Sequence, residues 1–234
     1  MGSLTDWTYR TFWAREQHPY RLLERRLLEL ATAGMTILDA GCGHTAPNLQ
    51  PLKASGARLV GVDLVPLEPQ EGLELIVGDL AKVPLPDQSV DLIYSRSVME
   101  HVVDPDAVYA EARRLLKPGG RWIFLTANRW DYVSLVSRMT PNRFHAAIVS
   151  RFEGREDIDV FPTAYRTNDR GQIAHYAAAQ GFRIERFERY GQYPAMFWKV
   201  GPLFLLATLY EKLIMKLGFF AGLRGWLYVE LVLD

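Results

Sequence analysis

The chain has 234 residues, of which 49% are hydrophobic and 23% charged, and its 27 basic residues balance its 27 acidic residues. A chain without net charge has no basic field to gather nucleic acid, so we expect no nucleic-acid partner. The single cysteine, Cys42, excludes an internal disulfide and fits a reducing compartment. The N-terminal residues lack the pattern of a signal peptide, and no apolar run is long enough to span a bilayer. We therefore expect a soluble, cytoplasmic protein.

Predicted strands and helices alternate along the first half of the chain. A helix is predicted over residues 10–30, and a second over 105–116 that is stopped by a Lys-Pro-Gly-Gly sequence. The second half adds a helix near 171–180. The predicted strands cover residues 36–40, 58–63, 73–77, 90–95, 121–126, 182–189 and 226–233. This alternation is typical of a doubly wound α/β sheet with helices on both faces, formed by one domain over residues 1–234.

Two irregular segments interrupt this order, and a helical cap over residues 1–30 precedes it. Residues 128–168 are rich in aromatics and arginine, and residues 191–225 are apolar. Connections over the carboxyl ends of a parallel sheet form its binding crevice, so we expect both insertions on the substrate side. Arginines among aromatics suit a ligand with an apolar body and an anionic group, although a surface lid explains the segment equally well. The candidate substrate residues are His18, Tyr20, Arg129, His145, Tyr165 and Arg166.

The segment 196–220 is unusually apolar for a connection. After Pro202 it predicts a helix with Lys212 and Lys216 on one side and apolar residues over most of the remaining surface. Such a helix must be covered. We expect burial in the core or in a homodimer before a role as pocket wall, and we rank contact with a membrane surface last.

The sequence Ile-Leu-Asp-Ala-Gly-Cys-Gly at residues 37–43 predicts a buried strand that ends in a glycine turn. Asp63 closes the next strand, about 20 residues later, the interval that a strand–helix–strand unit requires. Glycines let the backbone approach a ligand closely, and a carboxylate at the neighbouring strand end can accept from both hydroxyls of a ribose. The pattern therefore predicts a cofactor that contains a nucleoside.

Two further acids help to decide which nucleoside binds. Residues 41–46 match the dinucleotide pattern G-x-G-x-x-A, so an NAD-dependent oxidoreductase is one alternative. Asp39 precedes the glycines, where it would repel a pyrophosphate but attract a cationic amino acid. Asp79 closes the third strand, where it can accept from the exocyclic amine of adenine. A lone Asp at a strand end is most often a helix cap or turn residue, but acids at three strand ends argue against coincidence.

These residues, together with a fourth strand that leads into Met-Glu-His at 99–101, resemble the class I S-adenosylmethionine-dependent methyltransferases. The resemblance is dense over residues 36–127 and looser over the closing strands. It implies a Rossmann-like, mostly parallel sheet of seven strands, whose last strand, 226–233, lies antiparallel beside the fifth. One departure is Thr45, where the family often has a third glycine.

The resemblance also implies S-adenosyl-L-methionine as the cofactor and no metal. By position, Asp39, Gly41 and Gly43 would hold its methionine end, Asp63 the ribose and Asp79 the adenine. We add the neighbours of these residues to the cofactor-binding set: Cys42, His44, Leu64, Gly78, Leu80, Ser95 and Arg96.

The chemistry of this cofactor requires little from the protein besides alignment and a dry site. His101 is the candidate general base for a hydroxyl acceptor, although we prefer to interpret it as a packing residue. The expected acceptor is a small or lipid-like molecule. O-methylation is slightly favoured by its frequency in the family, with N- and C-methylation open. A methyltransferase-like binding module without turnover is the remaining alternative.

Overall fold

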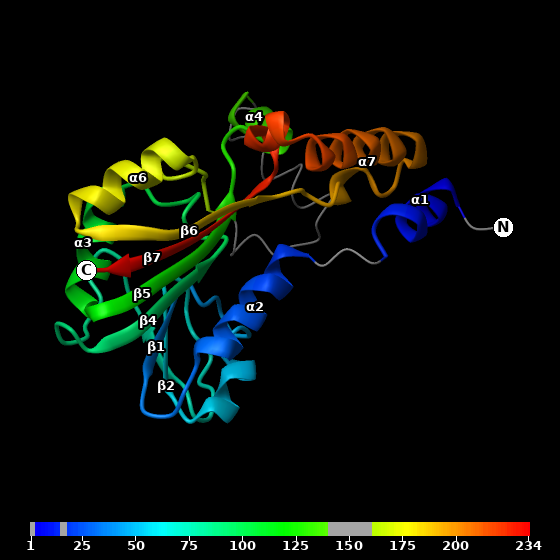
Figure 1. Cartoon of the computed structure of the whole chain (residues 1–234). Helices are drawn as coiled ribbons and strands as arrows, with labels where there is room; N and C mark the ends of the chain where they lie inside the picture. Colours follow the sequence, from blue (N-terminus) through cyan, green and yellow to red (C-terminus); the bar gives the residue numbers. More distant parts are fainter. Residues whose placement is uncertain (1–2, 15–17, 140–160) are drawn as a thin grey trace.

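A seven-stranded sheet forms the centre of the computed structural model, which describes residues 3–14, 18–139 and 161–234 (Figure 1). The strand order is β3-β2-β1-β4-β5-β7-β6. All neighbouring strands are parallel except β7, which pairs antiparallel with both β5 and β6. The predicted fold is therefore confirmed. The strands are β1 (Thr36–Ala40), β2 (Arg58–Asp63), β3 (Glu74–Val77), β4 (Val90–Arg96), β5 (Leu116–Ala127), β6 (Phe182–Tyr190) and β7 (Trp226–Leu233).

Strand β5 begins five residues earlier than the predicted start at Arg121. Leu116 already pairs with Val90, and the register then shifts before Leu92 pairs with Arg121. The Lys-Pro-Gly-Gly sequence therefore ends helix α3 (Pro105–Leu115) and forms the irregular start of the strand.

Helices cover both faces of the sheet. One face carries α2 (Pro19–Leu30) and the 3-10 helix η1 (Gln50–Ser55), and the other carries α3 and α6 (Arg170–Ala179). Side chains alternate between the two cores along the central strand β1: Ile37 packs with Leu23 of α2, whereas Leu38 packs in the core that contains Val108 of α3. Every residue of β1 is buried, as expected for a parallel strand covered on both sides.

The N-terminal segment forms two helices, so the prediction of one helix over residues 10–30 is wrong. Helix α1 (Leu4–Phe12) begins with a capping box between Ser3 and Asp6. Helix α2 begins at Pro19, with the His18 side chain accepting from the backbone N–H of Tyr20. A proline fits the first turn of a helix but not its interior, so Pro19 sets the new start.

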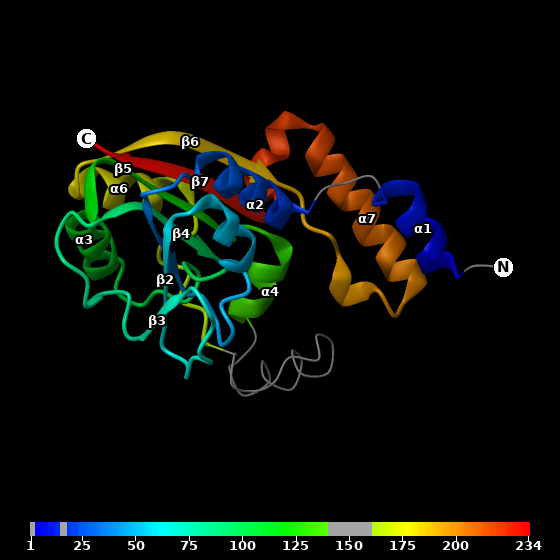
Figure 2. The ribbon, with the colours of Figure 1, turned by 90° about the horizontal axis from the view of Figure 1, so that it is seen from below.

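Helices α1 and α7 (Gly201–Lys216) form a pair that projects from the sheet (Figures 1 and 2). The Thr5 hydroxyl donates to the carbonyl of Trp198 at 3.2 Å, and the indole N–H of Trp13 donates to Thr208 at 3.0 Å. The ammonium of Lys212 lies 4.0 Å from the centre of the Trp13 ring. These contacts join the start of α1 to the residues just before α7, and the end of α1 to the middle of α7. The two helices therefore run in the same direction. The short elements around the pair are α4 (Tyr132–Met139), η3 (Ala195–Phe197) and η4 (Gly218–Leu223).

The prediction of a helix in the apolar insertion is confirmed. The prediction that this helix is buried in the core is wrong for one of its faces. Helix α7 buries the face that carries Phe204, Thr208 and Ile214. No helix in the described part of the chain is both long and apolar enough to cross a membrane. The opposite face carries five leucines that are 40% to 63% exposed, which we call the leucine row: Leu203, Leu206, Leu209, Leu213 and Leu217.

Candidate functional site

The turn after β1 holds two glycines in backbone conformations that other residues rarely adopt. Gly41 has φ +90° and Gly43 has φ +70°. A Cβ atom on Gly41 would lie 2.2 Å from Cγ2 of Val98, whereas a Cβ atom on Gly43 would meet nothing within 4 Å. Gly41 therefore lets the turn pack against the segment after β4, and Gly43 leaves open space for a ligand to approach the backbone.

The two acids at the ends of β2 and β3 are held by backbone N–H groups. One carboxylate oxygen of Asp63 accepts from Gly43 N at 2.7 Å, and the other accepts from Val65 N at 3.3 Å. Asp79 is exposed and accepts from Ala81 N at 2.9 Å. Because each carboxylate oxygen has two lone pairs, these bonds fix both acids and leave acceptor capacity for ligand hydroxyl or amine groups.

A cleft of about 400 Å³ lies in front of these residues. It brings together eight of the predicted residues: Gly41, Gly43, Asp63, Leu64, Asp79, Leu80, Arg96 and His101. Other residues of its lining were not predicted from the sequence, among them Ser97, Val98, Asp104 and Phe161. The cleft is therefore lined by acids at the strand ends and by a mixture of valines and polar residues along the segment that follows β4.

Asp39 lies under the glycine turn with no exposed surface. Its Oδ2 accepts from the Tyr94 hydroxyl at 2.8 Å, whereas its Oδ1 has no hydrogen-bond partner among the described residues. Burial raises the pKa of Asp39 to about 7. A buried carboxylate with an unsatisfied oxygen is stabilised by a nearby cation, so Asp39 suits the amino group of a methionine moiety.

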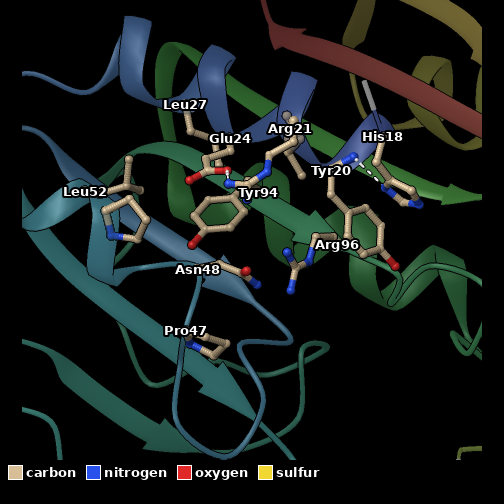
Figure 3. A pocket seen from close by; sticks show the side chains of 12 residues that line it. His18, Tyr20, Arg21, Glu24, Leu27, Pro47, Asn48, Leu52, Tyr94 and Arg96 are labelled. Atoms are coloured by element: carbon tan, nitrogen blue, oxygen red, sulfur yellow. Dashed lines mark hydrogen bonds and ion pairs between the residues drawn. The ribbon is translucent and has the colours of Figure 1, made fainter. Parts of the chain in front are cut away.

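A second pocket, of about 380 Å³, adjoins the cleft at Arg96 (Figure 3). Side chains of α2 line one side of it, and Tyr94 and Asn48 line the other. The guanidinium of Arg96 lies 4.5 Å from the centre of the Tyr20 ring, and the Tyr20 hydroxyl is 2.8 Å from the Ser97 hydroxyl. Arg96 has no ion pair in the described part of the chain, which suits it to an anionic group such as a carboxylate.

Two predicted cofactor residues have side chains in the core. Cys42 is 2% exposed, and burial raises the pKa of its thiol to about 12. Ser95 is fully buried and accepts from the indole N–H of Trp122 at 3.4 Å. Any contact of Cys42 and Ser95 with a cofactor would therefore be made by their backbone atoms, and their assignment as cofactor-binding residues stays a prediction. Alternate residues of a strand point to opposite faces, and Ser95 points away from the side to which Tyr94 and Arg96 point.

The other two predicted cofactor residues support neighbouring loops. The exposed ring of His44 donates from Nδ1 to the carbonyl of Pro66, in the connection after β2. Gly78 donates its N–H to the carbonyl of Asp63 at 2.9 Å. Both contacts fix the backbone around the carboxylates rather than adding a side chain to the cleft.

His101 lies at the edge of the cleft with one of its ring nitrogens engaged. A carbonyl oxygen can only accept, so Nδ1 of His101 donates to the carbonyl of Pro162 at 3.2 Å. In the neutral ring this tautomer leaves the lone pair on Nε2. The ring also contacts Phe161 edge to face, with centroids 6.2 Å apart. His101 therefore contacts Pro162 and Phe161, and its Nε2 has no hydrogen-bond partner among the described residues.

An apolar cavity of about 630 Å³ lies between α1, the start of α2 and the insertion after β6. His18 lines this cavity and the pocket of Figure 3, so the two are neighbours. Burial lowers the pKa of His18, and the neighbouring Arg96 lowers it further. His18 is therefore neutral at pH 7. Aromatic side chains dominate the rest of the lining: Tyr9, Trp13, Tyr190, Tyr193 and Trp198.

The structure does not bring the remaining candidate substrate residues into these cavities. Arg129 pairs with Asp169 at 3.5 Å, and Arg166 donates to the carbonyl of Val103 at 2.7 Å. Tyr165 is buried, with its backbone N–H donating to the carbonyl of Glu100. These contacts anchor the described part of the insertion, and His145 lies outside the described residues.

Comparison with known proteins identifies the family. Residues 38–124 match the model of the methyltransferase domain. The matched region, residues 38–124, is a methyltransferase domain of the class I S-adenosylmethionine-dependent methyltransferases. The matched region of this methyltransferase contains all three strand-end acids and both glycines of the turn. The methyl donor of the family is S-adenosyl-L-methionine.

Two curated relatives of the methyltransferase act on different acceptors. A sterol 24-C-methyltransferase of Gibberella zeae is 35% identical over 99 residues, which cover 37% of this chain and 26% of that protein. A malonyl-[acyl-carrier protein] O-methyltransferase of Yersinia pestis is 34% identical over 109 residues, which cover 43% of this chain and 40% of that protein. The chain thus spans less than half the length of either relative.

A solved structure shows the same fold. An S-adenosylmethionine-dependent methyltransferase from Mesorhizobium loti superimposes with a TM-score of 0.58 at 20% identity, covering 90% of this chain and 96% of that one. The likeness therefore extends beyond the matched domain to the strands that close the sheet.

The carboxylate of Asp63 gives a direct test of the cleft. Asp63→Ala should weaken binding of S-adenosylhomocysteine roughly 10- to 100-fold, because charged hydrogen bonds to two hydroxyls contribute about 1.5–3 kcal/mol. Asp63→Asn should weaken binding less, since the amide oxygen can still accept from Gly43 N. Titration calorimetry measures both, with the exposed acid of α3 replaced by Asp106→Ala as a control. An unchanged dissociation constant in folded Asp63→Ala would show that Asp63 acts only in the turn.

Proposed function

We propose that this chain transfers a methyl group from S-adenosylmethionine to a small, apolar acceptor. The observation that supports the cofactor assignment most strongly is the unsatisfied, buried oxygen of Asp39 behind an open glycine turn. In this arrangement Asp39 faces the amino group of the methionine moiety, Arg96 its carboxylate, and Asp63 and Asp79 the ribose and adenine. S-adenosylmethionine supplies an electrophilic methyl group when bound, and the chain supplies alignment and exclusion of water.

The apolar cavity is the proposed acceptor pocket. Its wall is aromatic and contains the thioethers of Met196 and Met215, and Lys199 is the charged residue at its edge. Such a wall favours an aliphatic or ring-containing molecule and offers few groups for a strongly polar one. Two contacts support this assignment. His18 lines both this cavity and the pocket beside the cleft, and Tyr20, which lines that pocket, is bonded to Ser97 of the cleft.

An oxygen atom is the proposed methyl acceptor. A hydroxyl loses its proton as it attacks, and the free Nε2 of His101 at the edge of the cleft can accept that proton. The curated relatives include both a C- and an O-methyltransferase, so they support the general reaction rather than the acceptor atom.

Calorimetry and an acceptor screen test the proposal in sequence. S-adenosylhomocysteine should bind with a dissociation constant of about 1–10 μM and NAD should not bind, whereas preferential NAD binding would overturn the cofactor assignment. The protein is then incubated with methyl-labelled S-adenosylmethionine and separate pools of aliphatic alcohols, fatty acids, sterols and amines, and products are identified by mass spectrometry. A labelled ether or ester supports O-methylation, and a labelled amine or carbon overturns it.

A paired substitution links the acceptor to the cavity. Trp198→Ala opens the wall and should raise the KM for an apolar acceptor several-fold without changing S-adenosylhomocysteine binding. Trp130→Ala, at another partly exposed tryptophan outside this cavity, serves as the control. Equal KM values in the two variants would place the acceptor elsewhere.

A further inference from the structure

The leucine row of α7 is a continuous apolar stripe. Its members are spaced three or four residues apart, so they occupy an arc of about 120° along the whole helix. Leu206 is 63% exposed and Leu213 is 52% exposed. A contiguous apolar surface of this kind marks a binding surface rather than scattered surface residues.

The position of the helix keeps this stripe turned outward. The opposite face packs against α1, where Trp13 donates to Thr208 and Lys212 lies over the Trp13 ring. Figures 1 and 2 both show the α1–α7 pair projecting beyond the sheet. Rotating the leucines inward would break these contacts, so the stripe stays uncovered within the described part of the chain.

Exposed apolar side chains also lie just before and just after the helix. Val200 precedes α7 and is 46% exposed. Phe219 follows it and is 93% exposed, so its ring is almost entirely in solvent. Aromatic side chains at the margins of an apolar stripe are typical of helices that lie in a membrane interface.

The charges around the stripe have one sign. Lys199 and Lys216 are exposed near its two ends. The only acid between residues 196 and 225 is Glu211, which has no exposed surface. The outward charge of this segment is therefore positive although the whole chain is neutral, which complements an anionic lipid surface.

We propose that the leucine row, flanked by Lys199, Lys216 and Phe219, docks the protein on an anionic lipid surface. The helix would lie parallel to the bilayer with its leucines in the acyl boundary and its lysines at the headgroups. A second copy of the chain fits this surface less well. In an antiparallel pair of these helices, Lys199 of one copy would lie near Lys216 of the other. These like charges would repel each other, because the segment has no exposed acid to pair with them. This docking is independent of methyl transfer, so the two proposals can fail separately.

Vesicle co-sedimentation tests the docking. The full chain should sediment with vesicles of phosphatidylcholine and phosphatidylglycerol, more weakly with phosphatidylcholine alone, and less as salt is raised. Leu213→Glu should lower the partition coefficient roughly tenfold, because a half-exposed leucine is replaced by a charge that the acyl region excludes. Lys199→Glu with Lys216→Glu should remove the preference for anionic vesicles.

A matched control variant and tests of folding separate a loss of vesicle binding from a loss of structure. Leu28→Glu places the same charge at a leucine that is 49% exposed on α2, and its partition should equal that of the unchanged chain. Circular dichroism and S-adenosylhomocysteine binding report whether each variant is folded. Failure of the unchanged chain to sediment, or equal losses in Leu28→Glu and Leu213→Glu, would overturn the proposal. Sedimentation equilibrium that shows a dimer dissociated by Leu213→Glu would assign the surface to a second copy instead.

Discussion

Gly41→Ala should destabilise the protein by about 2–5 kcal/mol. The left-handed backbone at Gly41 costs an alanine about 1–2 kcal/mol, and overpacking adds about 1–3 kcal/mol. The added methyl group would meet Cγ2, Cγ1 and Cβ of Val98 at 2.2, 3.1 and 3.2 Å. Because all three carbon atoms are close, rotation of the valine side chain cannot relieve the clash. Urea denaturation followed by circular dichroism measures the loss.

Gly43→Ala is the matched control for this steric argument. The backbone conformation is similar, with φ +70°, but no atom lies within 4 Å of the new methyl group. Its stability should fall by only about 1 kcal/mol. Its affinity for S-adenosylhomocysteine should fall strongly, because the methyl group occupies the space that the ligand needs. Equal losses of stability in the two variants would show that contact with Val98 is not what requires a glycine at position 41.

The sheet could be predicted because its central strands are short apolar runs between glycines, prolines and polar turns. The strand-end acids could also be placed, since parallel strands end at the same edge. The bond between Tyr94 and Asp39 joins residues 55 positions apart and has no local signal. The direction of the Ser95 side chain could not be predicted, because nearness to a motif says nothing about which face of a strand a side chain takes.

The structures of the N-terminal cap and of the apolar insertion could be predicted from the sequence only in part. Helical periodicity continues across residues 10–30, and only Pro19 indicates where the second helix begins. In α7 the apolar character correctly predicted a helix, but the sequence did not show which face packs against α1 and which face carries the exposed leucine row. The aromatic cavity forms where α1, the start of α2 and the segment after β6 come together, so it had no counterpart in any single segment.

Glu211→Gln should stabilise the protein above pH 7. The carboxyl group of Glu211 has no exposed surface, and burial raises its pKa to about 8. The neighbouring Asp131 raises the pKa further, whereas the backbone N–H of Gln192 and the ammonium of Lys212 lower it. The folded protein therefore holds the proton of Glu211 at pH values where the unfolded chain releases it. Stability must then fall as the pH rises from about 4.5 to about 8 and change little from this group above that range.

A glutamine at position 211 removes this penalty. Its amide oxygen can keep the bond from Gln192 N, which Glu211 accepts at 3.0 Å. Its neutral amide is also not repelled by the neighbouring Asp131 carboxylate, which raises the pKa of Glu211. We expect the free energy of unfolding to rise by about 2–4 kcal/mol near pH 8 and to match that of the unchanged chain near pH 4.5. Urea denaturation at both pH values measures the difference, with the exposed Glu71→Gln as control. A gain that is the same at both pH values would mean that packing rather than ionisation of Glu211 limits the stability of the contact between α4 and α7.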